Sequence, residues 1–165
     1  MHSITTGLAA ADCKIISEKL NQLLASNYFL YLKTHNFHWN VIGPMFQPLH
    51  ALFEEQYIDL WNAGDQIAER IRGLGHFVEA SYTSFSRLTH IQDTYQDDKQ
   101  ATKPPAAKQM IKQLKQDHEA MAHFIRGEPL LASDSANDQV TLDLLTHRMT
   151  FHEKQAWMLR SFLNQ

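Results

Sequence analysis

The sequence predicts an all-α protein, a four-helix bundle in which a long connection joins the second helix to the third. Apolar residues recur at spacings of three and four in four long stretches, and no stretch alternates between apolar and polar residues. Glycines and prolines such as Gly43, Pro44, Gly73 and Gly127 divide these stretches. With 165 residues the chain suits one domain, so we expect a short flexible tail over 1–11 and a single helical domain over 12–165.

The first two helices are expected over about 12–39 and 45–72. Gly43 and Pro44 make continuation between them unfavourable, and Gly73 and Gly75 end the second helix. Each helix carries one apolar stripe for the core. The stripe residues are Ile16, Leu20, Leu23, Leu24, Tyr28 and Tyr31 in the first helix, and Leu49, Phe53, Leu60, Gly64, Ile67 and Ile71 in the second.

The connection that follows, from about residue 75 to 103, is long for a bare loop, so we expect a short helix near 84–90. Pro104 and Pro105 suit the start of the third long helix, which Gly127 ends. The run Ser135-Ala-Asn-Asp138 resembles a capping box that opens the fourth. The stripes of these two helices are Ala107, Ile111, Leu114, His118, Met121 and Ile125, and then Leu142, Leu145, Met149, His152, Ala156, Leu159 and Leu163.

The composition excludes several classes of protein. A total of 15 basic and 18 acidic residues leave a net charge of −3, which does not favour a strongly basic nucleic-acid binder. No apolar run approaches the roughly 18 residues of a membrane helix. The start of the chain lacks the pattern of a signal peptide, and the single cysteine, Cys13, favours a reducing compartment. We therefore expect a cytoplasmic protein with no membrane partner.

Metal-ligating residue types gather on one face of the expected second helix. His50 and Glu54 lie one turn apart, as do Asp65 and Glu69, and the gap between the two pairs is close to three full turns. All four residues therefore share a face. His38 lies near the end of the first helix, and a tight antiparallel hairpin would bring it near His50.

Distance decides how these five residues could act. Along the helix axis Glu54 and Asp65 lie about 16 Å apart and His50 and Glu69 about 28 Å apart, whereas ligands lie about 2.0–2.2 Å from one metal. One chain therefore cannot close a single site with both pairs. The two pairs share a midpoint between residues 59 and 60. Two antiparallel copies related by a twofold axis there would form two sites, each with His38, His50 and Glu54 of one chain and Asp65 and Glu69 of the other.

The donor set indicates the metal. Two histidines with three carboxylates suit one or two iron ions per shared site, with manganese, cobalt or zinc able to compete. The large apolar residues Ile58 and Trp61 lie between the ligand pairs, whereas a merely solvent-exposed helix face would carry polar residues there. Two alternatives stay open, a merely solvated acidic face and a static zinc site in a structural assembly. Because histidine must be deprotonated to ligate, we expect iron binding to weaken as the pH falls through about 6.5.

The same residues carry a resemblance to the Dps family of mini-ferritins, in the ferritin-like superfamily. The similar stretches are His35-Asn-Phe-His-Trp-Asn-Val-Ile-Gly43, Phe46, Leu49-His50, Phe53-Glu54, Asp65-Gln-Ile-Ala-Glu-Arg70 and His152-Glu-Lys-Gln-Ala-Trp-Met-Leu-Arg160. The match covers about residues 12–163. The Glu-x-x-His signature of conventional ferritins is absent from the sequence, which argues against that class.

The resemblance implies a ferroxidase whose copies assemble into a hollow dodecamer. Such a protein would bind Fe(II) at dimer interfaces, oxidise it preferentially with hydrogen peroxide, store ferric mineral inside and so protect DNA from oxidative damage. It would work in the bacterial cytoplasm or nucleoid. The family's site falls on His38, His50, Glu54, Asp65 and Glu69, and Glu54 stands where the members compared first have aspartate.

The resemblance also gives roles to residues outside the ligand set. Trp39 and Trp61 are expected near the site, where they would absorb stray oxidising equivalents, although packing alone explains them equally well. His35, one turn from His38, would support the ligands. An acidic pore through which iron enters would include Asp138 and Asp143, although acidic residues also favour helix starts for electrostatic reasons.

DNA compaction is the main alternative function, with metal binding secondary. Family members that bind DNA typically use a mobile tail rich in lysine and arginine. The first 13 residues here contain neither, and the chain ends without a basic extension. We therefore expect weak or no DNA binding at neutral pH, with histidine protonation able to add positive charge in acid.

Overall fold

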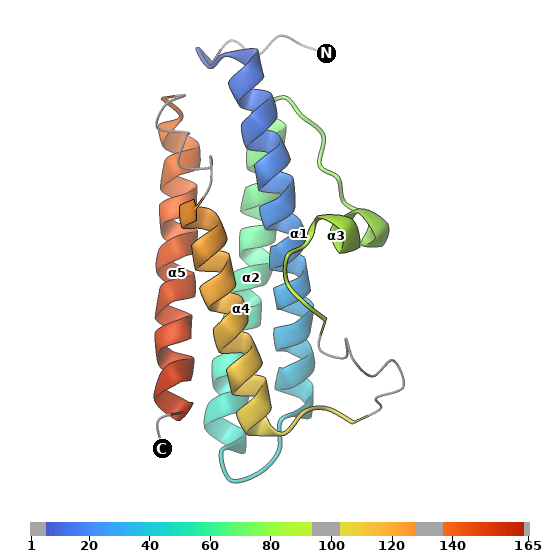
Figure 1. Cartoon of the computed structure of the whole chain (residues 1–165), viewed down its shortest axis with the longest axis vertical. Coiled ribbons are helices and arrows are strands. Elements are labelled where there is room, and N and C mark those ends of the chain that lie inside the picture. Colours follow the sequence, from blue (N-terminus) through green and yellow to red (C-terminus); the bar gives the residue numbers. More distant parts are fainter. Residues whose placement is uncertain (1–5, 94–102, 128–136, 164–165) are drawn as a thin grey trace.

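The computed structural model describes residues 6–93, 103–127 and 137–163. These ranges contain five helices and no strand: α1 (Ala10–Asn40), α2 (Phe46–Gly73), α3 (Tyr82–Leu88), α4 (Ala107–Gly127) and α5 (Gln139–Leu163). Four long helices lie side by side, and α3 lies against the outside of α1 (Figure 1). The predicted all-α class, the ferritin-like four-helix bundle and the short helix in the long connection are confirmed.

The hairpin of α1 and α2 sets the geometry of the predicted ligand face. Gly43 adopts a φ of +106°, which glycine tolerates and other residues rarely adopt. Its carbonyl accepts a hydrogen bond from the Phe46 N–H at 3.0 Å, which closes the turn. Further along, the Asn27 amide donates to the Leu60 carbonyl at 2.8 Å. These two hydrogen bonds, one at the turn and one further along the helices, fix the register of α1 against α2.

The hydrophobic core lies between the helices, with α1 packed mainly on α2 and α4 mainly on α5. Most of the predicted stripe residues are buried, including Leu20, Phe53 and Leu159. The stripe residues at the margins of the core are only partly buried, namely Tyr28, Tyr31, Ala107, Leu142, Met149 and Leu163. Among the helices of the described ranges, none is long and apolar enough to span a bilayer.

A polar layer crosses the interior of the bundle. His118 of α4 and His152 of α5 are fully buried, and their Nδ1 atoms form a hydrogen bond of 2.9 Å. Arg148 is also buried and pairs with Asp59 of α2 at 2.6 Å. Burial and the charge of Arg148 lower the pKa of His118 to about 3. Burial likewise lowers the pKa of His152 far below its ordinary value, so both rings are neutral at physiological pH.

Three helices start at residues other than those expected. Helix α1 begins at Ala10, inside the expected tail, and Leu8 already packs against the core; residues 1–5 of that tail lie outside the described ranges. Helix α3 begins at Tyr82, because the Ser81 hydroxyl accepts the Ser84 N–H at 3.0 Å. The third long helix begins at Ala107 rather than at the two prolines.

The cap of α5 also differs from the expected capping box. Ser135 lies outside the described residues, and the helix begins at Gln139. Asp138 is its N-cap, because the carboxylate accepts the Thr141 N–H at 3.0 Å. The same carboxylate pairs with Arg70 of α2 at 2.7 Å. The start of α5 is therefore fixed to α2 by an ion pair.

Candidate metal centre

Two of the predicted ligands, His38 and His50, lie stacked where α1 and α2 meet. Their ring centroids are 3.8 Å apart. The Nδ1 of His38 bonds the backbone carbonyl of His50 at 2.9 Å, and the Nδ1 of His50 bonds the carbonyl of His38 at 2.8 Å. A carbonyl only accepts, so each Nδ1 must carry the proton and each neutral ring keeps its Nε2 lone pair. This tautomer and the fixed ring orientation suit metal binding through Nε2.

Glu54 lies on the same face, one helical turn after His50, with its side chain exposed. Tyr57 follows Glu54 by three residues on α2, so the two side chains share a face of the helix. The Tyr57 ring also meets the His38 ring edge-on, with centroids 5.1 Å apart. Burial and the charge of Glu54 raise the pKa of Tyr57, so the phenol keeps its proton.

The structure does not bring the other two predicted ligands to the histidine pair. Asp65 and Glu69 are exposed residues on the far half of α2, which runs as one uninterrupted helix from Phe46 to Gly73. In the part of the chain that the structure describes, no group of three or more His, Cys, Asp or Glu side chains lies where it could hold a metal ion. Within one chain the two ligand pairs therefore lie far apart along α2, as their sequence spacing predicts.

His35 lies behind the site and touches no ligand carboxylate. Its ring is stacked between Trp39 and Tyr57, with centroid distances of 3.9 Å to each. Its Nδ1 is hydrogen-bonded to the Tyr31 hydroxyl at 3.2 Å. Burial and the nearby His38 lower the pKa of His35. His35 therefore packs on Tyr57, whose ring contacts His38, and its supporting role stays a prediction.

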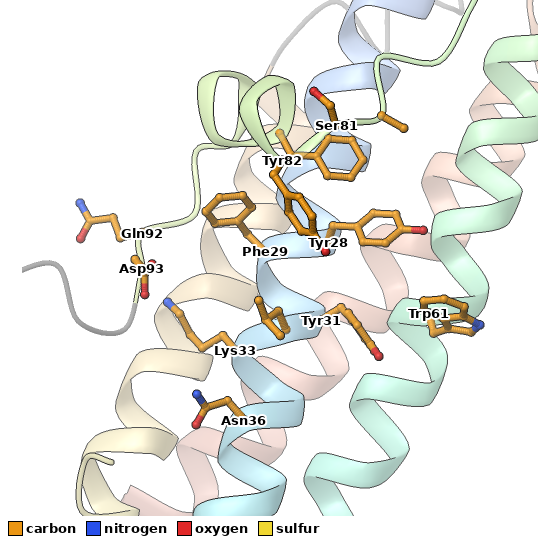
Figure 2. Close-up of a pocket in the computed structure, with 13 residues that line it drawn as sticks. Tyr28, Phe29, Tyr31, Lys33, Asn36, Trp61, Ser81, Tyr82, Gln92 and Asp93 are labelled. Atoms are coloured by element: carbon orange, nitrogen blue, oxygen red, sulfur yellow. The ribbon is translucent and has the colours of Figure 1, made fainter. Parts of the chain in front are cut away.

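Trp61 lies away from the histidine pair, beside a groove of roughly 710 Å³ between α1, α2 and α3 (Figure 2). Its ring packs on Tyr31 with centroids 5.5 Å apart and on Tyr28 at 6.4 Å. Tyr28 in turn stacks on Phe85 of α3 at 4.9 Å. None of the five predicted ligands lines this groove.

Apolar side chains surround the predicted ligands on the exposed face of α1 and α2. Trp39 is 61% exposed, Trp61 56% and Ile58 47%. A surface where large apolar groups alternate with exposed carboxylates is typical of an interface rather than of a solvated face.

The two predicted pore residues have different surroundings. Asp138 is buried. Its carboxylate pairs with Arg70 and accepts a hydrogen bond from the Thr141 N–H at the start of α5. Asp143 is exposed and lies 3.5 Å from the Nδ1 of His147, one turn further along α5. The pore role stays a prediction for both residues.

Tyr57 and Tyr31 lie beside the predicted ligand face, and the sequence does not single them out as site residues. Tyr57 follows Glu54 by three residues and His50 by seven, a helical spacing that places all three on one face of α2. This helical spacing is the sequence signal by which Tyr57 could be placed beside the predicted ligands. The sequence predicts Tyr31 only as part of the core stripe, where its ring partly lies.

Comparisons with known proteins agree with the fold and the motifs. The model of the ferritin-like domain family matches residues 17–165. DNA protection during starvation protein 2 of Bacillus anthracis is 38% identical over 152 residues, covering 92% of this chain and 99% of the relative. An uncharacterized low temperature-induced protein of Nostoc sp. is 39% identical over 163 residues, covering 99% and 88%. Among solved structures, a Dps protein of Vibrio cholerae O1, a member of the ferritin-like diiron-carboxylate superfamily, superposes with a TM-score of 0.87 at 28% identity, covering 99% of this chain and 98% of that one.

Proposed function

Because the chain belongs to the Dps family of ferritin-like proteins, we propose that it oxidises Fe(II), preferentially with hydrogen peroxide, and stores the ferric product inside a shell of its own copies. The observation that carries this proposal is the pair of His38 and His50. Reciprocal bonds to backbone carbonyls leave both Nε2 atoms free as ligands.

The site we propose is shared between two subunits. His38, His50 and Glu54 lie at one end of the ligand face, and Asp65 and Glu69 of the partner subunit would complete it. The exposed apolar groups between the two pairs support burial of this face against a second copy. The larger assembly we propose is the hollow dodecamer that the family resemblance implies.

The donor set accounts for the chemistry. Carboxylates and neutral imidazoles bind Fe(II), the substrate, and five protein ligands leave positions for the oxidant. Two Fe(II) ions supply the two electrons that, with two protons, reduce one hydrogen peroxide to two waters. No hydroxyl radical is then released, so DNA is protected through the removal of iron and peroxide.

The test is anaerobic loading of the assembled protein with Fe(II), followed by peroxide or oxygen in parallel. Ferric absorbance gives the rate, and size exclusion shows whether iron stays with the particle. A His50→Asn variant keeps an amide that can donate to the His38 carbonyl but removes the Nε2 ligand. We expect it to assemble normally and to oxidise Fe(II) at least about tenfold more slowly.

The matched control is Glu55→Gln, which removes an exposed carboxylate of α2 beside the ligand face rather than on it. This variant should keep the parent rate. A parent particle that oxidises Fe(II) no faster than buffer does would overturn the proposal.

A further inference from the structure

We propose that Tyr31 is a redox-active residue, which gives one electron to hydrogen peroxide when a site holds a single Fe(II) ion, and that His35 accepts its proton. The inference rests on the proposed function and goes beyond it, because it adds an electron donor to the five ligands. The observation that carries it is a phenol hydrogen-bonded to an imidazole, within a series of rings in contact that begins at a predicted ligand.

The hydrogen bond joins the Tyr31 hydroxyl to the Nδ1 of His35 at 3.2 Å, one turn further along α1. A phenol has one proton to donate, and a neutral imidazole accepts at the nitrogen that carries none. A phenol that loses an electron also releases its proton, so a base in hydrogen-bond contact makes the oxidation easier. The Nδ1 of His35 is that base.

Aromatic rings connect Tyr31 with the predicted site. The centroid of the Tyr57 ring lies 5.1 Å from that of His38 and 6.3 Å from that of Tyr31. Electrons move between groups this close without a bond between them, so Tyr31 need not touch the metal. It can therefore donate an electron from outside the ligand set.

The surroundings of Tyr31 favour it over the two neighbouring tryptophans as the place of a radical. Trp39 and Trp61 are more than half exposed, so a radical on either ring would face solvent. Tyr31 is only partly exposed, and its ring packs on Trp61 with centroids 5.5 Å apart. A radical on Tyr31 is therefore better shielded, and its proton stays nearby on His35.

The electrons and protons balance over two steps. In the first step Fe(II) and Tyr31 give one electron each, and one peroxide with two protons from solvent becomes two waters. The other products are Fe(III), a neutral tyrosyl radical and protonated His35. In the second step the next Fe(II) reduces the radical, and His35 returns the proton to the phenol. The sum is the reaction of two Fe(II) with one peroxide, and a site with one iron releases no hydroxyl radical.

The experiment uses the assembled, full-length protein, loaded anaerobically with less than one Fe(II) per site. Excess hydrogen peroxide is added, and the sample is frozen rapidly for electron paramagnetic resonance. A spin trap in a parallel sample measures released hydroxyl radical. We expect a tyrosyl signal in the parent. Tyr31→Phe keeps the ring and removes the hydroxyl, so the signal should be lost and the hydroxyl-radical adduct should increase.

A second variant tests the proton acceptor. His35→Phe keeps a ring between Trp39 and Tyr57 but removes Nδ1, so the tyrosyl signal should fall. Tyr28→Phe is the matched control and should keep the signal. Tyr28 lies in the same cluster, 6.4 Å from Tyr31, but stacks on Phe85 rather than on a histidine. All variants are compared as particles of parent size.

The results separate this inference from the proposed function. A parent that oxidises Fe(II) with peroxide but forms no tyrosyl radical, or whose tyrosyl signal survives Tyr31→Phe, overturns the role of Tyr31 alone. A tyrosyl signal that His35→Phe leaves unchanged overturns the role of His35 as proton acceptor. A parent particle that oxidises Fe(II) no faster than buffer does overturns both the inference and the proposed function.

Discussion

Two pairs of histidines in this chain show how hydrogen bonding determines what a side chain can do. His38 and His50 bond backbone carbonyls through Nδ1 and keep Nε2 available. His118 and His152 bond each other through Nδ1 inside the core, where neither Nε2 has a partner among the described residues. The first pair therefore suits the proposed metal site, whereas the second is held neutral by burial.

The buried pair makes stability depend on pH. Burial lowers the pKa of His118 to about 3 and that of His152 well below its ordinary value. The unfolded chain protonates these rings near pH 6.5 and the folded chain does not, so unfolding takes up protons in acid. The free energy of unfolding should therefore fall as the pH drops below about 6.5, by about 1.4 kcal/mol per pH unit for each ring that stays neutral.

Urea unfolding between about pH 7 and pH 5 measures this slope before most carboxylates titrate. The exposed His147 offers a control, because His147→Gln should leave the slope unchanged. Stability that does not vary over this range would contradict the neutral state of the buried pair.

At the scale of elements, the α1–α2 turn is the point where one substitution should disturb the hairpin. A Cβ at Gly43 would meet no atom within 4 Å, so the cost of Gly43→Ala comes from its φ of +106° alone. We expect a loss of about 1–2 kcal/mol in the free energy of unfolding, measured by urea denaturation. Gly73→Ala is the control, because that glycine ends α2 without a positive φ. Equal stability of the two variants would refute this explanation.

The start of α5 provides a second prediction. Asp138→Asn keeps a good N-cap but loses the charge opposite Arg70, whereas Asp138→Ala loses both. We expect the alanine variant to be about 2 kcal/mol less stable than the parent and the asparagine variant to lie between them. Thermal unfolding of all three proteins gives the order, and an asparagine variant as unstable as the alanine variant would show that the cap contributes nothing.

The pH dependence of that difference follows from the same contacts. Burial raises the pKa of Asp138, but hydrogen bonds from Arg70 and Thr141 and the charge of Arg70 outweigh it and lower the pKa overall. The folded chain thus keeps the carboxylate ionised to lower pH than the unfolded chain does. The advantage of the parent over Asp138→Asn should be complete above about pH 4 and should decline as the pH falls further.

Helix positions were predictable because apolar spacing and Gly–Pro breaks are local signals, as the stripe from Leu49 to Ile71 shows. The shared face of His50, Glu54, Asp65 and Glu69 follows from the same periodicity. The reciprocal bonds of the histidine pair and the contacts of Tyr57 were not predictable, since they depend on the register of two helices and on side-chain rotamers. The ion pair of Asp138 with Arg70 was not predictable because the two residues are distant in sequence.

At the scale of the whole molecule, charge argues against direct compaction of DNA. The chain has a net charge of −3, so a shell of many copies is repelled by phosphates unless a strongly basic patch compensates. We expect no shift of duplex DNA in gels near neutral pH and moderate salt. Tight binding there that weakens steeply with added salt would instead favour the DNA-compacting alternative.

A site shared between subunits predicts that two inactive variants recover activity when they assemble together. His50→Asn breaks one half of each proposed site, and Glu69→Ala breaks the other half. In a twofold dimer of one variant with the other, one site receives both defects and the other site receives none.

The most direct measurement is therefore peroxide-driven Fe(II) oxidation by particles co-assembled from equal amounts of the His50→Asn and Glu69→Ala chains. Each variant alone should be nearly inactive. Random pairing leaves about a quarter of the sites intact, so we predict about a quarter of the parent rate for the mixture. A mixture no faster than the average of the two variants, in particles of normal size, would contradict a site shared between subunits.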